Sequence, residues 1–388
     1  MELIYLDHAA TTPVLPEVAA EALRGLESLW GNPSSLHATG IAARNALSDA
    51  RARFAATIGA RPEEILFTSG GTEADNLAVI GAARAAVPRG RRVLVSAVEH
   101  HAVLHAADVL AAEGFSVGRI PVDVSGRVRP GDLEGLLRPD VVLVSVMHAN
   151  NETGAVQPLT EISRLLRPRG ILLHTDAVQS LGKIPVDVGR LGVDLASFAA
   201  HKIYGPKGTG ALYVRTGVPL APLLVGGGHE AGRRAGTENV SGILAFAKAA
   251  EIAVRDLTVE SDRLRRLRDR LQAELAAGIG DLRMNGPAED RLPGHLSVCF
   301  SGVEAEGVIL QLSAEGISVS SGSACASGSG EPSHVLAAMG VPPDVARGTV
   351  RFTLGRGTRA EDIPLVVAAV HRAVDRLRAL NPLWPTDR

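Results

Sequence analysis

Short apolar segments and longer amphipathic segments alternate along the first 260 residues of the chain. Strand-like apolar runs lie at residues 64–67, 92–96, 141–146, 171–174 and 210–214. Helical periodicity is found at residues 16–29, 41–58, 72–86 and 102–112. The run at 141–146 is apolar on both faces, which is typical of a parallel sheet covered on both sides. The alternation predicts an α/β domain with a mostly parallel sheet.

The pattern changes near residue 260. A highly charged amphipathic helix is expected at residues 261–276, and shorter strands and helices follow it. This order predicts a smaller α+β domain. We therefore expect residues 15–258 to form a large domain, and residues 1–14 together with 259–388 to form a small one.

Composition narrows the classes of function. The 388 residues carry a net charge of −2 and only 3% aromatic side chains, which argues against nucleic acid as a partner. No run of 18 apolar residues occurs, and the first residues lack the basic-then-apolar order of a signal peptide. These features predict a cytoplasmic protein without a membrane partner.

The two cysteines have different surroundings. Cys299 lies in an alternating strand-like segment and is expected to pack as a small hydrophobic residue. Cys325 lies in a loop of Ser, Gly and Ala at about residues 320–332, where nothing apolar would bury its thiol. An exposed thiol is a liability unless it is used, although an incidental loop cysteine remains an alternative. Two cysteines exclude a disulfide framework and a Cys-rich metal cluster.

Lysine is scarce in this chain. Of 40 basic residues only Lys183, Lys202, Lys207 and Lys248 are lysines. Where arginine serves elsewhere, a retained lysine suggests chemistry that needs an amine, such as a Schiff base. Lys202 follows an apolar strand and precedes a Gly/Pro-rich loop, so it is the best candidate. A solvated loop lysine is the alternative.

Polar residues follow five predicted strands at what should be one edge of the sheet. They are Thr72, His100, Asn151, Asp176 with Gln179, and Lys202. Each has an ordinary alternative: a Gly-containing turn, a loop histidine or a structural salt bridge. Thr72 and Asp75 also have the spacing of a helix capping box. Together the five loops supply a phosphate cradle, a stacking ring, polar ring contacts, a pyridinium partner and a Schiff-base lysine, which specify pyridoxal 5′-phosphate (PLP).

The chain resembles the cysteine desulfurases of the NifS/IscS type, within the class V aminotransferases of PLP fold type I. The matching segments are residues 5–12, 31–35, 67–73, 99–100, 150–152, 176–180, 201–208, 226–230, 234–237, 321–325 and 331–334. The resemblance implies a large PLP-binding domain with a mixed, mostly parallel sheet and a smaller α+β domain that carries the catalytic-cysteine loop.

The resemblance also implies roles for residues. Lys202 would hold PLP and move protons, Cys325 would accept sulfur from L-cysteine, and His100 would stack on the ring. The other implied contacts are Asp176 with the ring nitrogen, Gln179 with the ring hydroxyl, Gly71, Thr72 and His201 with the phosphate, Thr237 with the phosphate of a second subunit, and Asn32, Asn151 and Arg351 with the substrate carboxylate.

Two positions depart from the family pattern. Many relatives have a serine whose hydroxyl contacts the phosphate where this chain has Ala199, so one hydrogen bond worth about 1 kcal/mol is missing. His101 stands where the best-known relative has lysine, and no role is assigned to it.

The resemblance implies a homodimer that passes the sulfur of a persulfide on Cys325 to an acceptor protein or an iron–sulfur scaffold. The PLP site would hold no metal, although Cys325 would be able to ligate a cluster transiently with a scaffold. A selenocysteine lyase or a class V aminotransferase would share the cofactor site, but an aminotransferase has no use for the thiol of Cys325. A scaffold without activity would not need Lys202. A nicotinamide dehydrogenase is disfavoured because the three-glycine fingerprint is missing.

Overall fold

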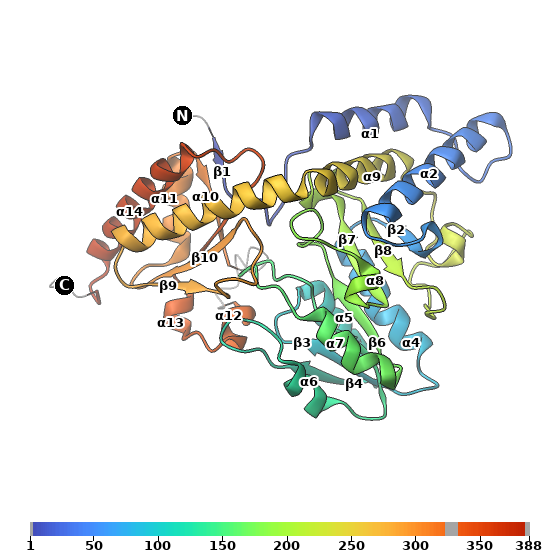
Figure 1. Cartoon of the computed structure of the whole chain (residues 1–388), viewed down its shortest axis with the longest axis horizontal. Helices are drawn as coiled ribbons and strands as arrows, with labels where there is room; N and C mark the ends of the chain where they lie inside the picture. Colours follow the sequence, from blue (N-terminus) through green and yellow to red (C-terminus); the bar gives the residue numbers. More distant parts are fainter. Residues whose placement is uncertain (1–2, 323–332, 385–388) are drawn as a thin grey trace.

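The protein was analysed as a computed structural model, which describes residues 3–322 and 333–384. Its largest sheet has seven strands in the order β2-β8-β7-β6-β5-β3-β4 (Figure 1). Only β8 runs antiparallel to its neighbours. The strands are β2 (Ile65–Thr68), β3 (Arg92–Ser96), β4 (Ser116–Ile120), β5 (Val141–Ser145), β6 (Leu172–Asp176), β7 (Leu195–Ala199) and β8 (Gly210–Val214). The predicted α/β class with a mostly parallel mixed sheet is therefore confirmed.

Helices cover both faces of this sheet. One face packs against α1 (Pro16–Ser28), α2 (Ala38–Thr57), α6 (Pro130–Leu136), α7 (Leu159–Leu166), α8 (Val188–Leu191) and α9 (Val240–Arg255). The other packs against α5 (His101–Ala112) and a continuous helical stretch made of α3 (Gly71–Asn76), a π-helical segment (Leu77–Gly81) and α4 (Ala82–Ala85). Two covered faces explain why the central strands are apolar on both sides.

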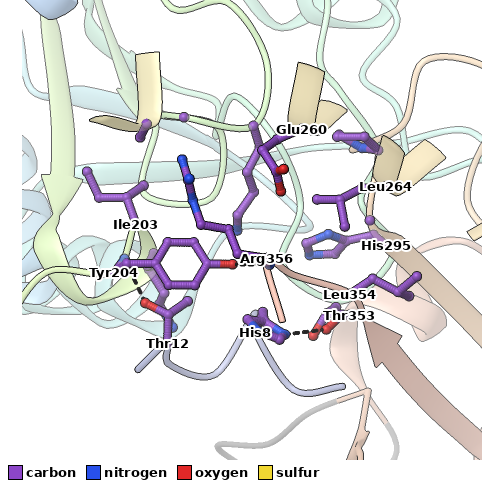
Figure 2. A pocket seen from close by; sticks show the side chains of 16 residues that line it. His8, Thr12, Ile203, Tyr204, Glu260, Leu264, His295, Thr353, Leu354 and Arg356 are labelled. Carbon is purple, nitrogen blue, oxygen red and sulfur yellow. Dashed lines mark hydrogen bonds between the residues drawn. The ribbon is translucent and has the colours of Figure 1, made fainter. Parts of the chain in front are cut away.

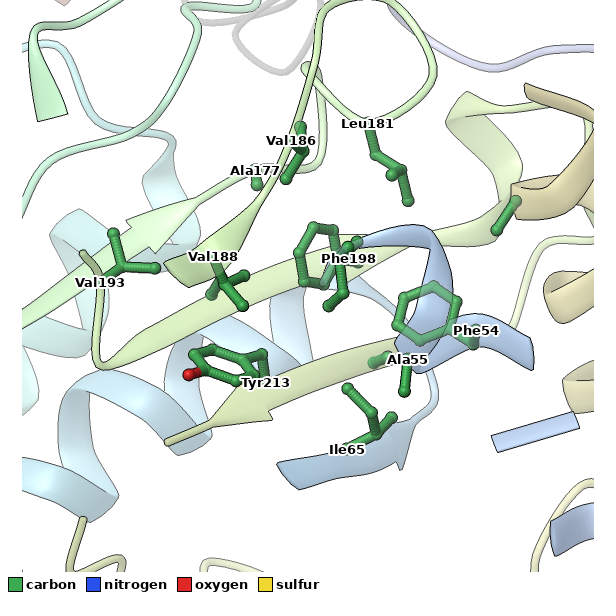
Figure 3. Packing of buried hydrophobic residues seen from close by; sticks show 14 of the residues in the cluster. Phe54, Ala55, Ile65, Ala177, Leu181, Val186, Val188, Val193, Phe198 and Tyr213 are labelled. Atoms are coloured by element: carbon green, nitrogen blue, oxygen red, sulfur yellow. The ribbon is translucent and has the colours of Figure 1, made fainter. Parts of the chain in front are cut away.

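Aromatic packing joins α2 to the strand that precedes Lys202. The Phe54 ring lies with its centroid 5.7 Å from that of Phe198 and 4.7 Å from that of Phe246 (Figure 3). Phe198 belongs to β7, so this cluster fixes the strand from which the Lys202 loop emerges.

A four-stranded antiparallel sheet in the order β12-β13-β10-β9 forms a second core. Its strands are β9 (Leu282–Asn285), β10 (His295–Phe300), β12 (Ser320–Ser321) and β13 (Thr349–Thr353). It packs with α10 (Leu257–Gly278), α11 (Ala305–Ala314) and α14 (Asp362–Leu380), and with the pair β1 (Ile4–Tyr5) and β11 (Ile317–Ser318). The short helices α12 (His334–Ala338) and α13 (Pro343–Ala346) complete this part.

The long helix α10 follows α9 directly and runs from the large sheet to the small one (Figure 1). Cys299 is fully buried in β10, and its sulfur lies 2.9 Å from Thr349 Oγ1. The exact domain boundaries stay a prediction. No helix in the described part of the chain combines the length and the apolar composition that spanning a bilayer requires.

Candidate active site

A cavity of about 360 Å³ lies at the carboxyl edge of the large sheet, where β2, β3, β5, β6 and β7 end. Its volume is within the range of small-molecule sites. The structure brings most of the predicted site residues to its wall: Gly71, Thr72, His100, Asn151, Asp176, Gln179, His201, Lys202 and Arg351.

Lys202 is held by the N-terminal segment. It ends a short 3₁₀ turn (Ala200–Lys202) that follows β7. Its Nζ donates to the carbonyl oxygens of Ala9 and Ala10, both at 2.6 Å. These two carbonyl acceptors fix the amine at the cavity wall.

Asp176 is the last residue of β6 and is buried. Burial raises the pKa of its carboxyl to about 6, and the backbone N–H of Val178 and the charge of Lys202 oppose this rise. The Val178 N–H donates to Oδ1 at 2.9 Å. A buried carboxyl of this kind is stabilised by a cationic partner in the cavity.

Two further buried carboxyls lie near Asp176. Burial raises the pKa of Glu99 to about 7, and burial followed by the charge of Asp176 raises the pKa of Asp75 well above its usual value. Of these three carboxyls, only Asp176 has its pKa lowered by the charge of Lys202. Negative charge is therefore expected on Asp176 before the other two.

His174 lies behind Asp176 and is neutral. Its Nδ1 is 2.8 Å from Ser145 Oγ and its Nε2 is 3.0 Å from Ser197 Oγ, while burial lowers its pKa to about 3. Nε2 is also 3.6 Å from Asp75 Oδ1, a distance that an ion pair would allow. The His174 ring is neutral, and the raised pKa of Asp75 keeps its carboxyl protonated. The contact therefore joins two neutral groups and is not an ion pair.

His100 presents a neutral ring to the cavity. It caps α5, since its Nδ1 accepts from the Ala102 N–H at 3.1 Å. Nδ1 therefore carries no proton. Burial, followed by the nearby charge of Lys202, lowers the pKa of His100 to about 4. A neutral imidazole fixed by its own helix is suited to stacking on a flat ring.

Arg351 reaches the cavity from β13 of the small sheet. Its side chain is buried, with Nη2 2.9 Å from Asp7 Oδ1 and Nη1 donating to the Asn151 carbonyl oxygen at 2.9 Å. Its Nε has no hydrogen-bond partner among the described residues. A guanidinium has five N–H donors, and the two described bonds leave one N–H on each terminal nitrogen that can take a second carboxylate.

Asn32 and Thr237 do not line this cavity. Both are exposed, and Asn32 Oδ1 accepts from the Ser34 N–H at 2.9 Å. Their roles stay predictions.

Cys325 lies outside the described residues, but both flanks of its segment are placed. Ser333 donates from its hydroxyl to Glu152, a residue that lines the cavity. On the other flank, a Cβ added to Gly322 would lie 3.1 Å from Glu152 Oε2. Gly322 and Ser333, which flank the Cys325 segment, therefore both lie beside the cavity.

The predicted capping box of Thr72 and Asp75 is wrong. Helix α3 begins at Gly71, its N-cap Gly70 makes no side-chain cap, and the Ser69 N–H donates to Glu73 at 2.7 Å. Asp75 is buried beside Asp176 instead. The tight Gly70–Gly71 turn starts the helix one residue early and rotates Asp75 inward.

Sequence reasoning missed Asp75, Glu99, His174 and Lys183 as neighbours of the site. The available signal was a polar residue inside an apolar stretch, as with His174 in β6. Such a residue needs buried partners, and a strand sequence does not tell where those partners lie.

The donor set is compatible with PLP. A buried carboxyl, a neutral stacking imidazole, a lysine amine and the N-terminus of α3 share one cavity. At Gly71 an added Cβ would lie 2.7 Å from Val178 Cγ2, so only glycine leaves this wall open. The free N–H groups of the first helical turn attract a phosphate.

Comparison with known proteins agrees with this site. The class V aminotransferase family model matches residues 4–366. The chain belongs to the class V aminotransferases, among the cysteine desulfurases of the NifS/IscS type. It is 47% identical to a cysteine desulfurase IscS of Dictyoglomus turgidum over 98% of this chain and 96% of that protein. A family model over nearly the whole chain confirms the expected fold type.

Solved structures of family members are similar as well. A NifS-like protein superposes with a TM-score of 0.91 at 38% identity, covering 97% of this chain and all 100% of that one. The structure described as SspA in complex with cysteine has a TM-score of 0.80 at 34% identity, covering 90% of this chain and 98% of its own. The family implies dependence on PLP.

Proposed function

We propose that this protein is a PLP-dependent cysteine desulfurase that converts L-cysteine to L-alanine and leaves the sulfur as a persulfide on Cys325. The observation that carries the proposal is the common wall of one cavity, where Lys202, Asp176, His100 and Arg351 meet. Both flanks of the Cys325 segment lie beside Glu152 at the same cavity.

Each residue has a physical task. Arg351 and Asn151, which line the cavity, bind the substrate carboxylate; Asn32 does not line it, and its part in this contact stays a prediction. Lys202 Nζ would hold the cofactor, and the same amine would remove and return a proton at the substrate Cα. Asp176 holds the ring nitrogen in its protonated form, because an anion 5% exposed to solvent strongly favours a cation beside it. When bound, PLP supplies the electron sink that weakens bonds around the substrate Cα and Cβ.

Cys325 completes the transfer. Its thiolate forms a bond to the substrate sulfur while the Cβ–S bond breaks. The carbon skeleton keeps the electron pair, gains a proton and leaves as alanine. Cys325 then holds a persulfide, which passes to a sulfur-acceptor protein or an iron–sulfur scaffold. We further propose a homodimer in which Thr237 completes the phosphate site of the second subunit.

Two variants test the roles separately. Cys325→Ala is expected to keep the visible absorbance of bound PLP and to lose sulfide release from L-cysteine. Lys202→Ala is expected to lose the visible band of the covalently held cofactor. Normal turnover by Cys325→Ala would refute the persulfide route, and an unchanged band in Lys202→Ala would show that another amine holds PLP.

Substrate preference is tested by comparing L-cysteine with L-selenocysteine in the unmodified protein. The proposal expects alanine and a persulfide on Cys325, detected by mass spectrometry, from L-cysteine. Release of alanine from selenocysteine alone would make the protein a selenocysteine lyase.

A further inference from the structure

Lys183 is one of the chain's four lysines and, like Lys202, lies close to the site. The proposed reaction does not use it. It belongs to the turn after β6, where its N–H donates to the Ser180 carbonyl oxygen at 3.0 Å. The Ser261 hydroxyl of α10 donates to the Lys183 carbonyl oxygen at 2.7 Å. These backbone bonds fix the turn, and the side chain of Lys183 extends back toward Gln179. Lys183 Nζ lies 2.7 Å from Gln179 Oε1.

The two partners of Gln179 fix the orientation of its amide. An ammonium group has donors only, so the atom facing Lys183 must be the oxygen. A carbonyl has no donor, so the atom facing Ala9 O at 2.9 Å must be the nitrogen. The usual ambiguity of a glutamine amide is therefore removed. Gln179 lines the cavity. Of the two N–H groups on Nε2, one donates to Ala9 O, and the other is the donor left for a group bound in the cavity.

Lys183 and Lys202 both line a small pocket of about 40 Å³, and Figure 2 shows His8, Tyr204 and His295 around the same pocket. The titratable groups that line it are Lys202, Glu260, Arg356, His8, His295 and Tyr204. His295 Nε2 is buried there with no hydrogen-bond partner in the described part of the chain. A pocket of this size is large enough for a few water molecules.

Repulsion and burial weaken the charge on Lys183. Burial, followed by the charges of Lys202 and Arg351, lowers the pKa of its amine to about 7. The bond from Gln179 Nε2 to Ala9 O keeps Oε1 facing Lys183. A neutral amine still has N–H donors, so Lys183 donates to Oε1 in both protonation states. The orientation of Gln179 is therefore kept on either side of neutral pH.

We propose that Lys183 is a positioning residue: it holds Gln179 as a hydrogen-bond donor toward an ionised oxygen on the ring of the bound group. This inference rests on the proposed function, in which that group is PLP and the oxygen is its ring oxygen. A donor stabilises the deprotonated oxygen, whereas a flipped amide would repel it. Lys183 thus selects the ionised form of the cofactor without touching it.

A double-mutant cycle between Lys183→Met and Gln179→Leu tests the proposal. The readouts are the dissociation constant of PLP and the pH midpoint of the visible absorbance of the loaded protein. Lys183→Met is expected to weaken PLP binding roughly fivefold, the value of one neutral hydrogen bond, and to move the midpoint to higher pH. In the Gln179→Leu background the same substitution should change neither quantity.

The cycle separates positioning from the plain effect of removing a charge. A through-space effect of the Lys183 charge would persist in Gln179→Leu, and full additivity of the two substitutions would overturn the proposal. Lys183→Arg keeps donors and should restore both readouts. Lys248→Met, a half-buried lysine on α9, is the matched control and should leave both unchanged.

Folding and the proposed function are checked with the same proteins. If Lys183→Met lowers the melting temperature markedly, Lys183→Leu replaces it, because leucine also lacks the amine and leaves a smaller cavity than alanine would. Absence of a visible band in the unmodified protein would overturn the PLP function and this inference together. A normal band with additive substitutions would overturn the positioning role alone.

Discussion

At the scale of single residues, the proton on Asp176 decides what the cavity can hold. Asp75, Glu99, Glu152 and Asp176 are buried carboxyls in this region, and burial raises the pKa of each. Asp176 lies at the cavity wall, and the charge of Lys202 opposes the rise of its pKa. Asp176 is therefore the carboxyl that can offer an anion to a ring nitrogen.

Replacement of Asp176 by asparagine should stabilise the cofactor-free protein at neutral pH. The native pKa of about 6 lies above the usual 3.8, so the folded state keeps a proton that the unfolded state has lost. Stability contributed by this group therefore falls as pH rises from about 4 to 6. Asp176→Asn should raise the free energy of unfolding at pH 7.5 by about 3 kcal/mol, and by less at pH 4.5.

Urea unfolding of the cofactor-free protein at both pH values measures this effect. Asparagine keeps an acceptor for the Val178 N–H, so the comparison isolates the charge. An equal gain at pH 4.5 and 7.5 would show that Asp176 is already ionised at the lower pH.

Ala199 offers a gain of function at the same scale. It is 3% exposed, ends β7 and lines the cavity without a polar atom. Ala199→Ser should tighten PLP binding about fivefold by adding one hydrogen bond to the phosphate. Equilibrium dialysis measures the dissociation constant. Ala199→Val, which adds bulk without a hydroxyl, should not tighten binding.

At the scale of elements, hydrophobic periodicity found those strands and helices that have one kind of environment along their length. β3 and β8 were predicted at their observed bounds, and β10 is the strand-like segment expected around Cys299. α9 was missed, because it is buried on most sides between α1, α2 and the sheet and so lacks a polar stripe. β4 was missed because it is an edge strand containing Gly118 and Arg119, with little apolar content.

The Phe54 cluster should control the stability of the element that carries Lys202. Phe54 is fully buried and meets Phe67, Phe198 and Phe246. Phe54→Ala should lower the free energy of unfolding by about 3–5 kcal/mol, the cost of a large core cavity. Chemical denaturation measures it. Val259→Ala on α10, at a side chain 72% exposed, is the control and should cost little.

At the scale of the whole molecule, two distant segments present apolar side chains to solvent. Leu36 and Val225 are 86% and 82% exposed. Pro33, three residues before Leu36, and Gly228, three residues after Val225, line the same cavity of about 630 Å³. This surface is consistent with the proposed homodimer, and Thr237 follows it closely in the chain.

Charges placed on this surface should separate the subunits. Leu36→Glu with Val225→Glu should raise the dimer dissociation constant by roughly tenfold or more. PLP affinity should fall with it, since Thr237 would no longer reach the second phosphate site. Light scattering at several concentrations measures the first effect. Leu365→Glu, 60% exposed on α14, is the control; dimers that persist in the double variant would place the interface elsewhere.

The sequence by itself determined the class of fold, the family and the list of chemical groups at the site. Apolar periods specify strands and helices, and parallel strands must end at one edge, so the residues after β2, β3, β5, β6 and β7 were bound to be neighbours. The scarcity of lysine marked Lys202 without any coordinates.

Only the tertiary structure decided which buried groups act on one another. The inward turn of Asp75, the neutral state of His174 and the bond from Lys183 to Gln179 depend on distances between segments and on the loss of water around them. Protonation and amide orientation respond to such surroundings and not to residue type, so no pattern along the chain could specify them.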